Sequence, residues 1–349
     1  MGLRERHDRS ARPQFNFILQ PEFPLNALIL ASDALRIANQ NSGRELFGWS
    51  YVSDSGAPVH ASNGMWFGVD CGIRDMPPAD VCLLFEGNLP TQRNSPTLLA
   101  QLRAAARFGA IVGAVDTGAF ALAQAGLIGT REGDPAVMHW EAAPTFHERF
   151  PAAVLKDQIY LVDGSRAHCA GGVATLDLML HLIAGLEGEV LANEVANALV
   201  HTRRPPETQQ RSDPLPDRQH DVLTGRVIAL MERNLDFPLK LPELAREIGA
   251  SQRTITRLCR RNLGESPMRL YLHIRLQAAR NFLFYEDYSI KDVATACGFS
   301  YPAIFSRVFK ARFGQTPGAF RANFRKRQSE EVRPEIRRLI AGSAQRVEL

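Results

Sequence analysis

Residues 290–317 read IKDVATACGFSYPAIFSRVFKARFGQTP, and residues 241–267 read LPELAREIGASQRTITRLCRRNLGESP. An alanine, a glycine and a serine recur between the two stretches at an offset of 49 residues. An arginine, a glycine and a proline further on recur at an offset of 50, so the second copy contains one added residue. This repeat predicts two copies of one supersecondary unit, and the fold of the C-terminal part follows from them.

The first copy has the pattern of a helix-turn-helix. Apolar residues recur on one face of a short helix that begins at Leu241, and Gly249 supplies the left-handed backbone that ends it. Ser251 is expected to cap the next helix, in which Ile255 and Leu258 point inward. The opposite face carries side chains that suit base edges and phosphates: Gln252, Arg253, Thr256, Arg257 and Arg260.

The second copy repeats this pattern, with Gly298 in the turn and Ser300 as the expected cap. Pro302 stands early in the second helix, where a missing N–H has no cost. The residues expected to pack inward are Ile304, Phe305, Val308 and Phe309. The residues expected to face DNA are Tyr301, Ala303, Ser306, Arg307 and Lys310.

Only some of these outward residues are expected to touch bases, because half or more of the contacts in such interfaces go to phosphate and sugar. The expected base contacts come from Arg253, Arg257, Tyr301, Ala303 and Arg307. Arg307 has an alternative role in the fold or on a phosphate, because it matches Arg257 at the repeat offset. Residues 268–285 form a predicted amphipathic helix that would hold the two recognition helices about one DNA turn, roughly 34 Å, apart.

Residues 298–321, GFSYPAIFSRVFKARFGQTPGAFR, resemble the signature of the AraC/XylS family of transcription regulators. The resemblance implies an all-α domain over residues 220–327 with two helix-turn-helix motifs that bind the major groove of double-stranded DNA. RNA polymerase is the implied partner of an activator. A homodimer is also expected, since paired half-sites supply affinity that one basic domain lacks.

The charge of the chain divides at the same boundary. Residues 14–202 hold 10 basic and 19 acidic residues, whereas residues 220–327 hold 19 basic and 9 acidic residues, within a net charge of +4 over 349 residues. An acidic module joined to a basic one indicates a polyanion partner for the basic module. The predicted organisation is an arm (1–13), a sensing domain (14–201), a semi-rigid Pro-rich linker (202–219), the DNA-binding domain and a tail (328–349).

Composition excludes several classes of protein. Five cysteines without a CxxC motif or a Cys/His cluster exclude a disulfide framework and a zinc site, and they fit a reducing cytoplasm. The longest apolar helix candidate contains Asp177 and His181, so no membrane span is expected. The N-terminus has no apolar region typical of a secretory signal. We expect a cytoplasmic protein without a metal or cofactor.

The acidic half alternates short β-type runs with helical stretches, which predicts a mainly parallel α/β sheet. The expected strands are 15–20, 81–87, the start of 110–127, and 158–164. The expected helices are 25–40, 95–108, the end of 110–127, 173–187 and 189–201.

The most informative point in this half is Asp116, which stands at a predicted strand-to-helix elbow, where a side chain is held facing helix amides. The region resembles glutamine-amidotransferase-like proteins of the DJ-1/PfpI type, which have a nucleophilic Cys at the elbow and a partner His that corresponds to His139. Because Asp replaces Cys, we expect ligand binding and no catalytic residue. A hydrolase that uses Asp116 as nucleophile is the alternative.

All three tryptophans lie in the acidic half, and Trp140 directly follows His139. A carboxylate beside aromatic faces suits an alkylated ammonium, which gains from cation–π contact. Asn63 is a candidate donor for the carboxylate of a zwitterion, and His139 is either a ligand group or a structural residue. The expected ligand-binding residues are Asp116, His139, Trp140, Glu22, Trp66, Asn63 and Glu86, whereas Trp49 is expected in the core.

The segments ASNGMW, FEGNLPTQ and GAVDTGAFALAQAGL resemble a subfamily of regulators that respond to glycine betaine or dimethylglycine. This resemblance implies an activator that senses a small methylated amine in a catalytically inactive domain. Carnitine, sarcosine and arginine remain alternative effectors. A ligand-free architectural DNA-binding protein is the alternative from another class.

Overall fold

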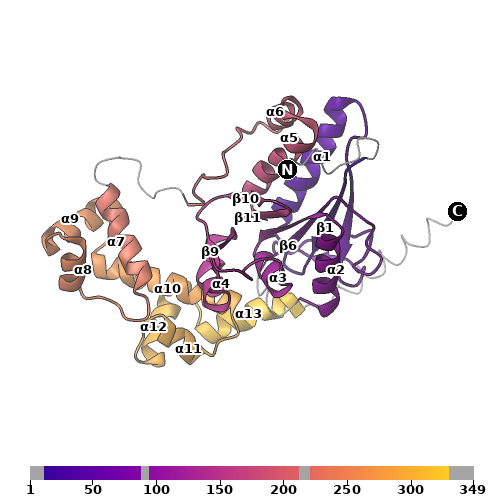
Figure 1. Cartoon of the computed structure of the whole chain (residues 1–349). Helices are drawn as coiled ribbons and strands as arrows, with labels where there is room; N and C mark the ends of the chain where they lie inside the picture. The colour runs from indigo at the N-terminus through magenta and orange to yellow at the C-terminus, as the bar shows by residue number, and fades with distance from the viewer. Residues whose placement is uncertain (1–11, 88–93, 212–220, 330–349) are drawn as a thin grey trace.

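The computed structural model describes residues 12–87, 94–211 and 221–329. The chain forms an α/β domain and a helical domain, which lie against each other along the lower edge of the α/β domain in Figure 1. None of the helices in the described ranges is long and apolar enough to cross a bilayer.

The α/β domain is built on a seven-stranded sheet with the order β10-β11-β7-β6-β1-β2-β5. Its strands are β1 (Gln14–Leu19), β2 (Gly48–Ser53), β5 (Cys71–Gly72), β6 (Val81–Glu86), β7 (Ile111–Asp116), β10 (Tyr160–Asp163) and β11 (Arg166–Cys169). All neighbouring pairs are parallel except β10 with β11. The predicted mainly parallel sheet is confirmed, and its carboxyl ends gather on one edge.

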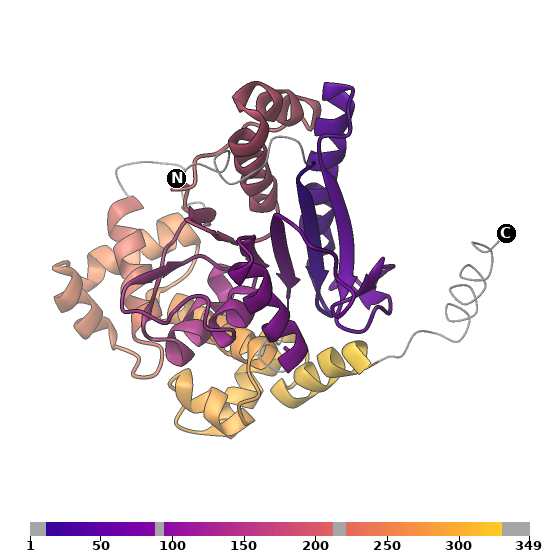
Figure 2. The ribbon, with the colours of Figure 1, turned by 45° about the vertical axis from the view of Figure 1, so that its right-hand side comes forward.

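Helices cover both faces of this sheet (Figure 2). One face carries α1 (Leu25–Ser42), α5 (Ala174–Glu187) and α6 (Glu189–Ala198), and the other carries α2 (Pro96–Arg107), α3 (Ala119–Gln124) and α4 (Ala143–Arg149). Alternate residues of β1 serve the two cores: Phe17 and Leu19 pack on one face, and Ile18 packs on the other. A sheet buried on both faces explains why its strands are apolar throughout.

Two short two-stranded sheets and a 3₁₀ turn complete this domain. They are β3 (Val59–His60) with β4 (Trp66–Phe67), β8 (Asp134–Ala136) with β9 (Ala153–Leu155), and η3 (Trp140–Ala142). None of these short strands, nor β2 and β11, follows from the sequence pattern above. The predicted helix 189–201 was too long, since α6 ends at Ala198.

The first half of the predicted linker is part of the α/β domain. Arg204 forms an ion pair with the buried Asp177 (Nη2–Oδ2 2.6 Å), and Pro206 accepts a backbone hydrogen bond from Ile159 (3.2 Å). Gln210 donates to the carbonyl oxygens of Met138 (2.9 Å) and Gln158 (3.0 Å). Residues 202–211 therefore do not act as a free spacer. The rest of the linker (212–219), most of the arm and most of the tail lie outside the described residues.

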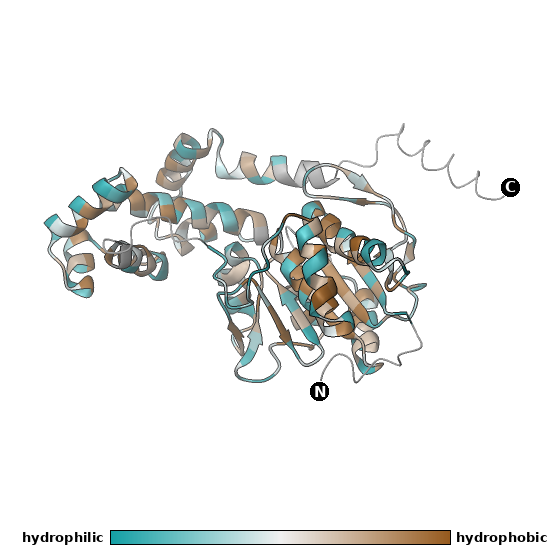
Figure 3. Cartoon of the chain, turned by 90° about the horizontal axis from the view of Figure 1, so that it is seen from above, coloured by the Kyte–Doolittle hydropathy of each residue, from teal (hydrophilic) through white to brown (hydrophobic). Residues whose placement is uncertain are grey.

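The helical domain contains α7 (Asp221–Arg233), α8 (Leu241–Ile248), α9 (Gln252–Leu263), α10 (Pro267–Tyr285), α11 (Ile290–Ala296), α12 (Pro302–Phe313) and α13 (Pro317–Ser329). The pairs α8–α9 and α11–α12 are the two predicted helix-turn-helix units, and each has its own small core. Several helices present apolar and polar faces separately (Figure 3). The 19-residue α10 joins the units and spans about 28 Å.

Two details of the second unit differ from the prediction. The N-cap of α12 is Tyr301, which makes no side-chain cap bond, so Ser300 as the cap was wrong. The added residue of the second copy separates Ser300 from the helix, whereas Ser251 caps α9 by accepting from the Thr254 amide (3.1 Å). Ile304 is 45 % exposed, so its expected inward position was also wrong.

Gly298, in the turn of the second helix-turn-helix unit, lies against the segment that connects α7 to α8 at the start of the first unit. This residue has φ +71°, and a Cβ there would lie 2.5 Å from the Leu235 carbonyl oxygen and 2.6 Å from Pro238 Cδ. From α10, Arg275 donates to the carbonyl oxygens of Cys297 and Gly298 (both 2.7 Å). The turn of the second unit is therefore fastened to both α10 and the first unit.

Gly298→Ala should destabilise the helical domain by roughly 3 kcal/mol, because it combines left-handed strain with a clash against backbone. Gly314→Ala is the matched control, since Gly314 has φ +77° with nothing within 4 Å of its Cβ position, and about 1–2 kcal/mol is expected there. Urea unfolding followed by circular dichroism measures both. Equal losses would show that the contact with Leu235 and Pro238 is not restrictive.

Candidate functional site: the strand-to-helix elbow

The predicted elbow is present at the end of β7. Asp116 is the last residue of the strand and has φ 64°, and α3 begins three residues later. Among the described residues only Glu22, Asp116 and Val200 combine a side chain with a positive φ. Such strain persists where the surroundings enforce it, and here the Thr117 hydroxyl donates to the carbonyl oxygen of Gly87 next to the turn.

The Asp116 carboxyl lies in a poorly solvating environment. A Cβ on Gly171 would be 3.0 Å from Asp116 Oδ2, so Gly171 lets the carboxyl lie directly against its backbone. No described residue donates a hydrogen bond to this carboxyl. Desolvation, and then the charge of Glu141, raise the pKa of Asp116 to about 8. The side chain predicted as a carboxylate is therefore largely protonated at neutral pH until a cation approaches.

His139 follows on the segment that leads into η3. Its backbone N–H donates to the Asp116 carbonyl oxygen (3.1 Å), and its Nδ1 accepts from the Glu141 amide (3.4 Å). Burial lowers the pKa of His139, which favours the neutral imidazole. The hydrogen bonds among the described residues include none between this imidazole and the Asp116 carboxyl. Among the described residues, the Asp116 carboxyl and this imidazole are therefore not joined as a nucleophile–base pair.

A cavity of about 170 Å³ opens at the elbow. Its described lining residues are His139, Trp140, Ile159, Ala170, Gly171, Val173, Ala174, Arg204 and Gln210. Arg204 and Gln210 come from the segment predicted as linker, and no local sequence pattern places them at this cavity. The described lining thus includes the neighbouring residues His139 and Trp140 but not Asp116, whose carboxyl lies against the lining residue Gly171.

The other predicted ligand residues lie in a second group. Glu22 is buried, has φ 67°, and bonds His60 Nδ1 through its Oε1 (2.9 Å). The Trp66 ring lies 5.2 Å from the His60 ring, and Asn63 is exposed in the β3–β4 turn, where its Oδ1 accepts from the Met65 amide (3.1 Å).

None of this second group is among the described residues that line the elbow cavity. Glu86 is buried at the end of β6, in register with Asp116. His60 was missed by the sequence analysis. An isolated histidine in a short hairpin gives no signal until the fold brings it to Glu22.

The cysteines and Trp49 have structural environments. Trp49 Nε1 donates to the Tyr51 hydroxyl (3.1 Å) and packs on the core, as predicted. All five cysteines are free, and four are buried, whereas Cys71 is only partly so. Burial raises the pKa of Cys169, the thiol closest in the chain to Gly171, to about 12, which suppresses the thiolate. The described residues contain no group of three or more His, Cys, Asp or Glu side chains placed to hold a metal ion.

The outward faces of α9 and α12 match the predicted DNA-facing sets. The exposed members are Gln252, Arg253, Arg257, Arg260, Tyr301, Ala303, Arg307 and Lys310, while Thr256 and Ser306 are half-buried. Tyr301 is 66 % exposed, although it is a large aromatic residue. None of the basic members of this set forms an ion pair with another described residue, which leaves their charges available to phosphate or guanine.

The elbow is connected directly to the helical domain. Glu141, two residues after His139, forms an ion pair with Arg280 of α10 (2.9 Å). In α4, Arg149 pairs with the fully buried Glu286, and Glu148 accepts from the Tyr288 hydroxyl (2.8 Å). The segment that contains His139 therefore also holds the C-terminal end of α10.

Comparison with known proteins identifies the family. A model described as "Helix-turn-helix domain" matches residues 244–323. The HTH-type transcriptional regulator CdhR of Pseudomonas aeruginosa is 37 % identical over 312 residues, which are 88 % of this chain and 91 % of the relative. The chain belongs to the AraC family of HTH-type transcriptional regulators. It is thus a DNA-binding regulator of transcription.

Other known proteins are also similar to this chain. The HTH-type transcriptional regulator GbdR of Pseudomonas aeruginosa is 36 % identical, covering 88 % of this chain and 84 % of the relative. An AraC family transcriptional regulator from Pseudomonas putida has a solved structure with 24 % identity and a TM-score of 0.48, covering 54 % of this chain and 99 % of that one. A ThiJ/PfpI family protein from Pseudomonas syringae shows 18 % identity and a TM-score of 0.49, covering 63 % and 87 %.

The raised pKa of Asp116 makes the stability of the regulator depend on pH. The unfolded chain ionises this carboxyl from about pH 4, whereas the folded chain does so near pH 8. The folded state therefore loses stability as pH rises between these values. Asp116→Asn should gain stability relative to the wild type from pH 5 to pH 8, with no further gain above pH 8.5. Denaturant unfolding at four pH values measures this, and a difference independent of pH would contradict the assigned environment.

Proposed function

We propose that this regulator is an activator that acts on DNA in the cytoplasm and responds to a small methylated amine, glycine betaine or dimethylglycine, at the elbow cavity. The observation that supports this most is the composition of the cavity wall. The described lining of this space of about 170 Å³ includes Trp140 and a guanidinium (Arg204), and the Asp116 carboxyl, which is not itself a lining residue, packs against the lining residue Gly171. RNA polymerase and a second copy of the chain are the further partners in this proposal.

These groups complement the two charges of a compact zwitterion. A quaternary ammonium cannot donate strong hydrogen bonds, so it favours the Trp140 ring and a nearby carboxylate. Its approach would favour the ionised form of Asp116, which desolvation disfavours in the empty site. The ligand carboxylate would pair with Arg204, a role for which Asn63 was the expectation from sequence. Arg204 is held in place by Asp177.

The size of the cavity favours the compact candidates. Sites for drug-sized ligands measure roughly 300–1,000 Å³, well above the elbow cavity. Carnitine and arginine carry longer chains than glycine betaine, dimethylglycine and sarcosine do. Carnitine and arginine are therefore the weaker alternatives at this position, and sarcosine differs only in having fewer methyl groups for the aromatic face.

The hydrolase alternative has less support. His139 is bonded to the Glu141 amide, and the pKa of Asp116 is raised, so neither group is prepared for nucleophilic attack. An architectural role would not explain the cavity or the Glu141–Arg280 ion pair that connects its neighbourhood to α10. Turnover that Asp116→Ala abolishes would support the hydrolase, and DNA occupancy indifferent to sequence and to amines would support the architectural protein.

Calorimetric titration of the full chain should detect saturable binding of glycine betaine or dimethylglycine, with weaker binding of carnitine and arginine. Affinity for glycine betaine should increase with pH, by up to about tenfold per unit, and level off above pH 8, because binding requires the ionised Asp116. Asp116→Asn should weaken binding and remove the pH dependence. Absence of binding below millimolar concentrations would refute the effector assignment and leave the DNA-binding function intact.

On the DNA side, Arg253→Ala should relax the sequence preference at one base-pair position by about 1–3 kcal/mol. Arg260→Ala, near the other end of the exposed face of α9, is the comparison. A phosphate-contacting arginine there should weaken binding to all sequences alike and reduce the salt slope by about one. Binding to a randomised operator library at several salt concentrations separates the two outcomes. Uniform weakening by Arg253→Ala would place that residue on a phosphate.

A further inference from the structure

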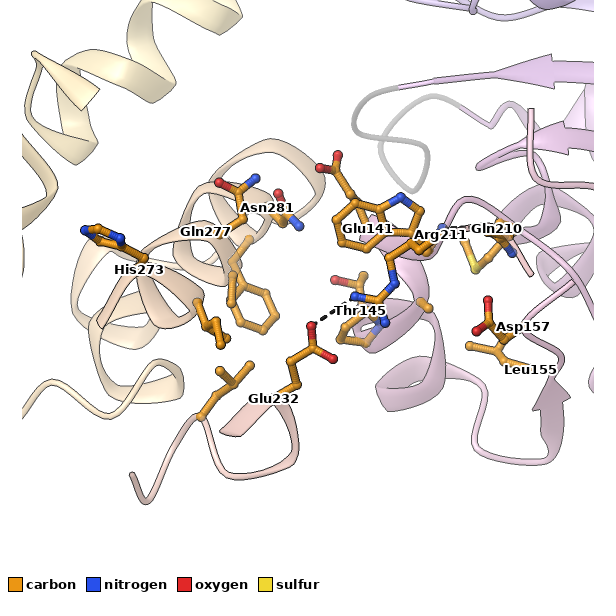
Figure 4. A pocket seen from close by; sticks show the side chains of 18 of the residues that line it. Glu141, Thr145, Leu155, Asp157, Gln210, Arg211, Glu232, His273, Gln277 and Asn281 are labelled. Atoms are coloured by element: carbon orange, nitrogen blue, oxygen red, sulfur yellow. Dashed lines mark hydrogen bonds and ion pairs between the residues drawn. The ribbon is translucent and has the colours of Figure 1, made fainter. Parts of the chain in front are cut away.

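A second and larger cavity lies between the two domains. This interdomain cleft has a volume of about 600 Å³. One wall comes from the segment 138–145 that follows the elbow, and the opposite wall comes from α10, with Glu232 of α7 below (Figure 4). Trp140 contributes to both the cleft and the elbow cavity, whereas Asp116 and Arg204 do not line the cleft.

The cleft already holds a cation that belongs to the chain. The Arg211 guanidinium lies over the Trp140 ring, 4.9 Å from its centroid, and its Nη1 pairs with Glu232 Oε1 (3.0 Å). The preceding residue, Gln210, accepts from the Trp140 amide (2.9 Å) and fixes the chain at this point. The face of the Trp140 ring on the cleft side therefore binds a cation, which can be a planar guanidinium or a tetrahedral ammonium.

This internal contact is weak enough to be exchanged. The side chains of Arg211 and Glu232 are 46 % and 37 % exposed, and ion pairs with such exposure contribute little to stability. A free cation would replace Arg211 without breaking a buried bond. The three anchoring hydrogen bonds of Gln210 do not involve the Arg211 side chain and would remain.

The remaining walls add selectivity for an amphipathic molecule. Asp157 and Glu232 supply negative charge near Trp140, beyond Glu141, which is paired with Arg280. Across the cleft, Ile274 and Phe282 of α10 present apolar side chains. Positively charged side chains also line the cleft: Lys156 precedes Asp157 in the chain, and Arg312 comes from α12. A cationic head at Trp140 with an alkyl chain directed toward α10 satisfies both walls.

We propose that the interdomain cleft is a second binding site, for a small aliphatic cation whose alkylated ammonium or guanidinium group replaces Arg211 on Trp140 and whose chain lies against Ile274 and Phe282. Such a ligand contacts both domains at once. It breaks the Arg211–Glu232 pair and bridges the domains in its place, so its binding depends on their present arrangement. The proposal does not depend on the identity of the effector at the elbow.

The test uses the full chain with butyltrimethylammonium as the probe and butan-1-ol as the uncharged comparison. Saturable calorimetric binding of the cation, and none of the alcohol, is expected. Arg211→Ala should tighten the binding of the probe about two- to fivefold, because the internal competitor is removed. Trp140→Leu should abolish it. Weaker or unchanged binding in Arg211→Ala would overturn the proposal.

Two further variants separate the cleft from the elbow. Asp157→Lys, on an exposed residue of the cleft wall, should weaken the binding of the probe at least tenfold, and Ala278→Phe should block the cleft from α10. Both should leave glycine betaine binding unchanged, whereas Asp116→Asn should affect glycine betaine and spare the probe. If Asp116→Asn weakens the binding of the probe and Asp157→Lys leaves it unchanged, the cation binds at the elbow and the second site is refuted.

Discussion

The arrangement of the molecule depends on one buried ion pair, between Arg149 of α4 and Glu286 after the end of α10. Glu286 is fully buried, and burial raises its pKa, while Arg149 opposes that shift. Removing the partner of a buried carboxylate is strongly destabilising, so the half-buried Arg149 stabilises the charged form of Glu286 at the junction of the two domains. The pair therefore fixes α10 against the segment that begins at the elbow.

This contact gives the charge division of the chain a structural meaning. In two contacts the acidic half supplies the carboxylate: Glu141 pairs with Arg280, and Glu148 accepts from Tyr288. In the third contact the acidic half supplies the cation, Arg149, and the basic half supplies Glu286. The basic side chains on the outer faces of α9 and α12 do not take part in these interdomain contacts. Charge in the helical domain thus contributes to docking on the side of α10, and the exposed basic side chains of α9 and α12 take no part in these ion pairs.

The path from effector to DNA is short. The His139 amide donates to the Asp116 carbonyl oxygen, the Glu141 amide donates to His139 Nδ1, and the Glu141 side chain pairs with Arg280 of α10. From α10, Arg275 holds the turn of the second helix-turn-helix unit. If the proposed effector changes the charge of Asp116, it also changes the interaction of this carboxyl with the Glu141 charge, and it shifts the domain arrangement only if its affinity differs between the two states.

The sequence by itself determined the two helix-turn-helix units, the outward recognition residues, the parallel sheet and the elbow at Asp116. These features are local: periodicity, turn glycines such as Gly249 and strand-to-helix punctuation depend on neighbours in the chain. Only the tertiary structure decided which distant groups surround the elbow. Arg204, Gln210 and Gly171 line the cavity at the elbow. Glu22 bonds His60, and the Arg211 guanidinium lies over the Trp140 ring. Contacts between residues far apart in the sequence depend on packing, which no local pattern encodes.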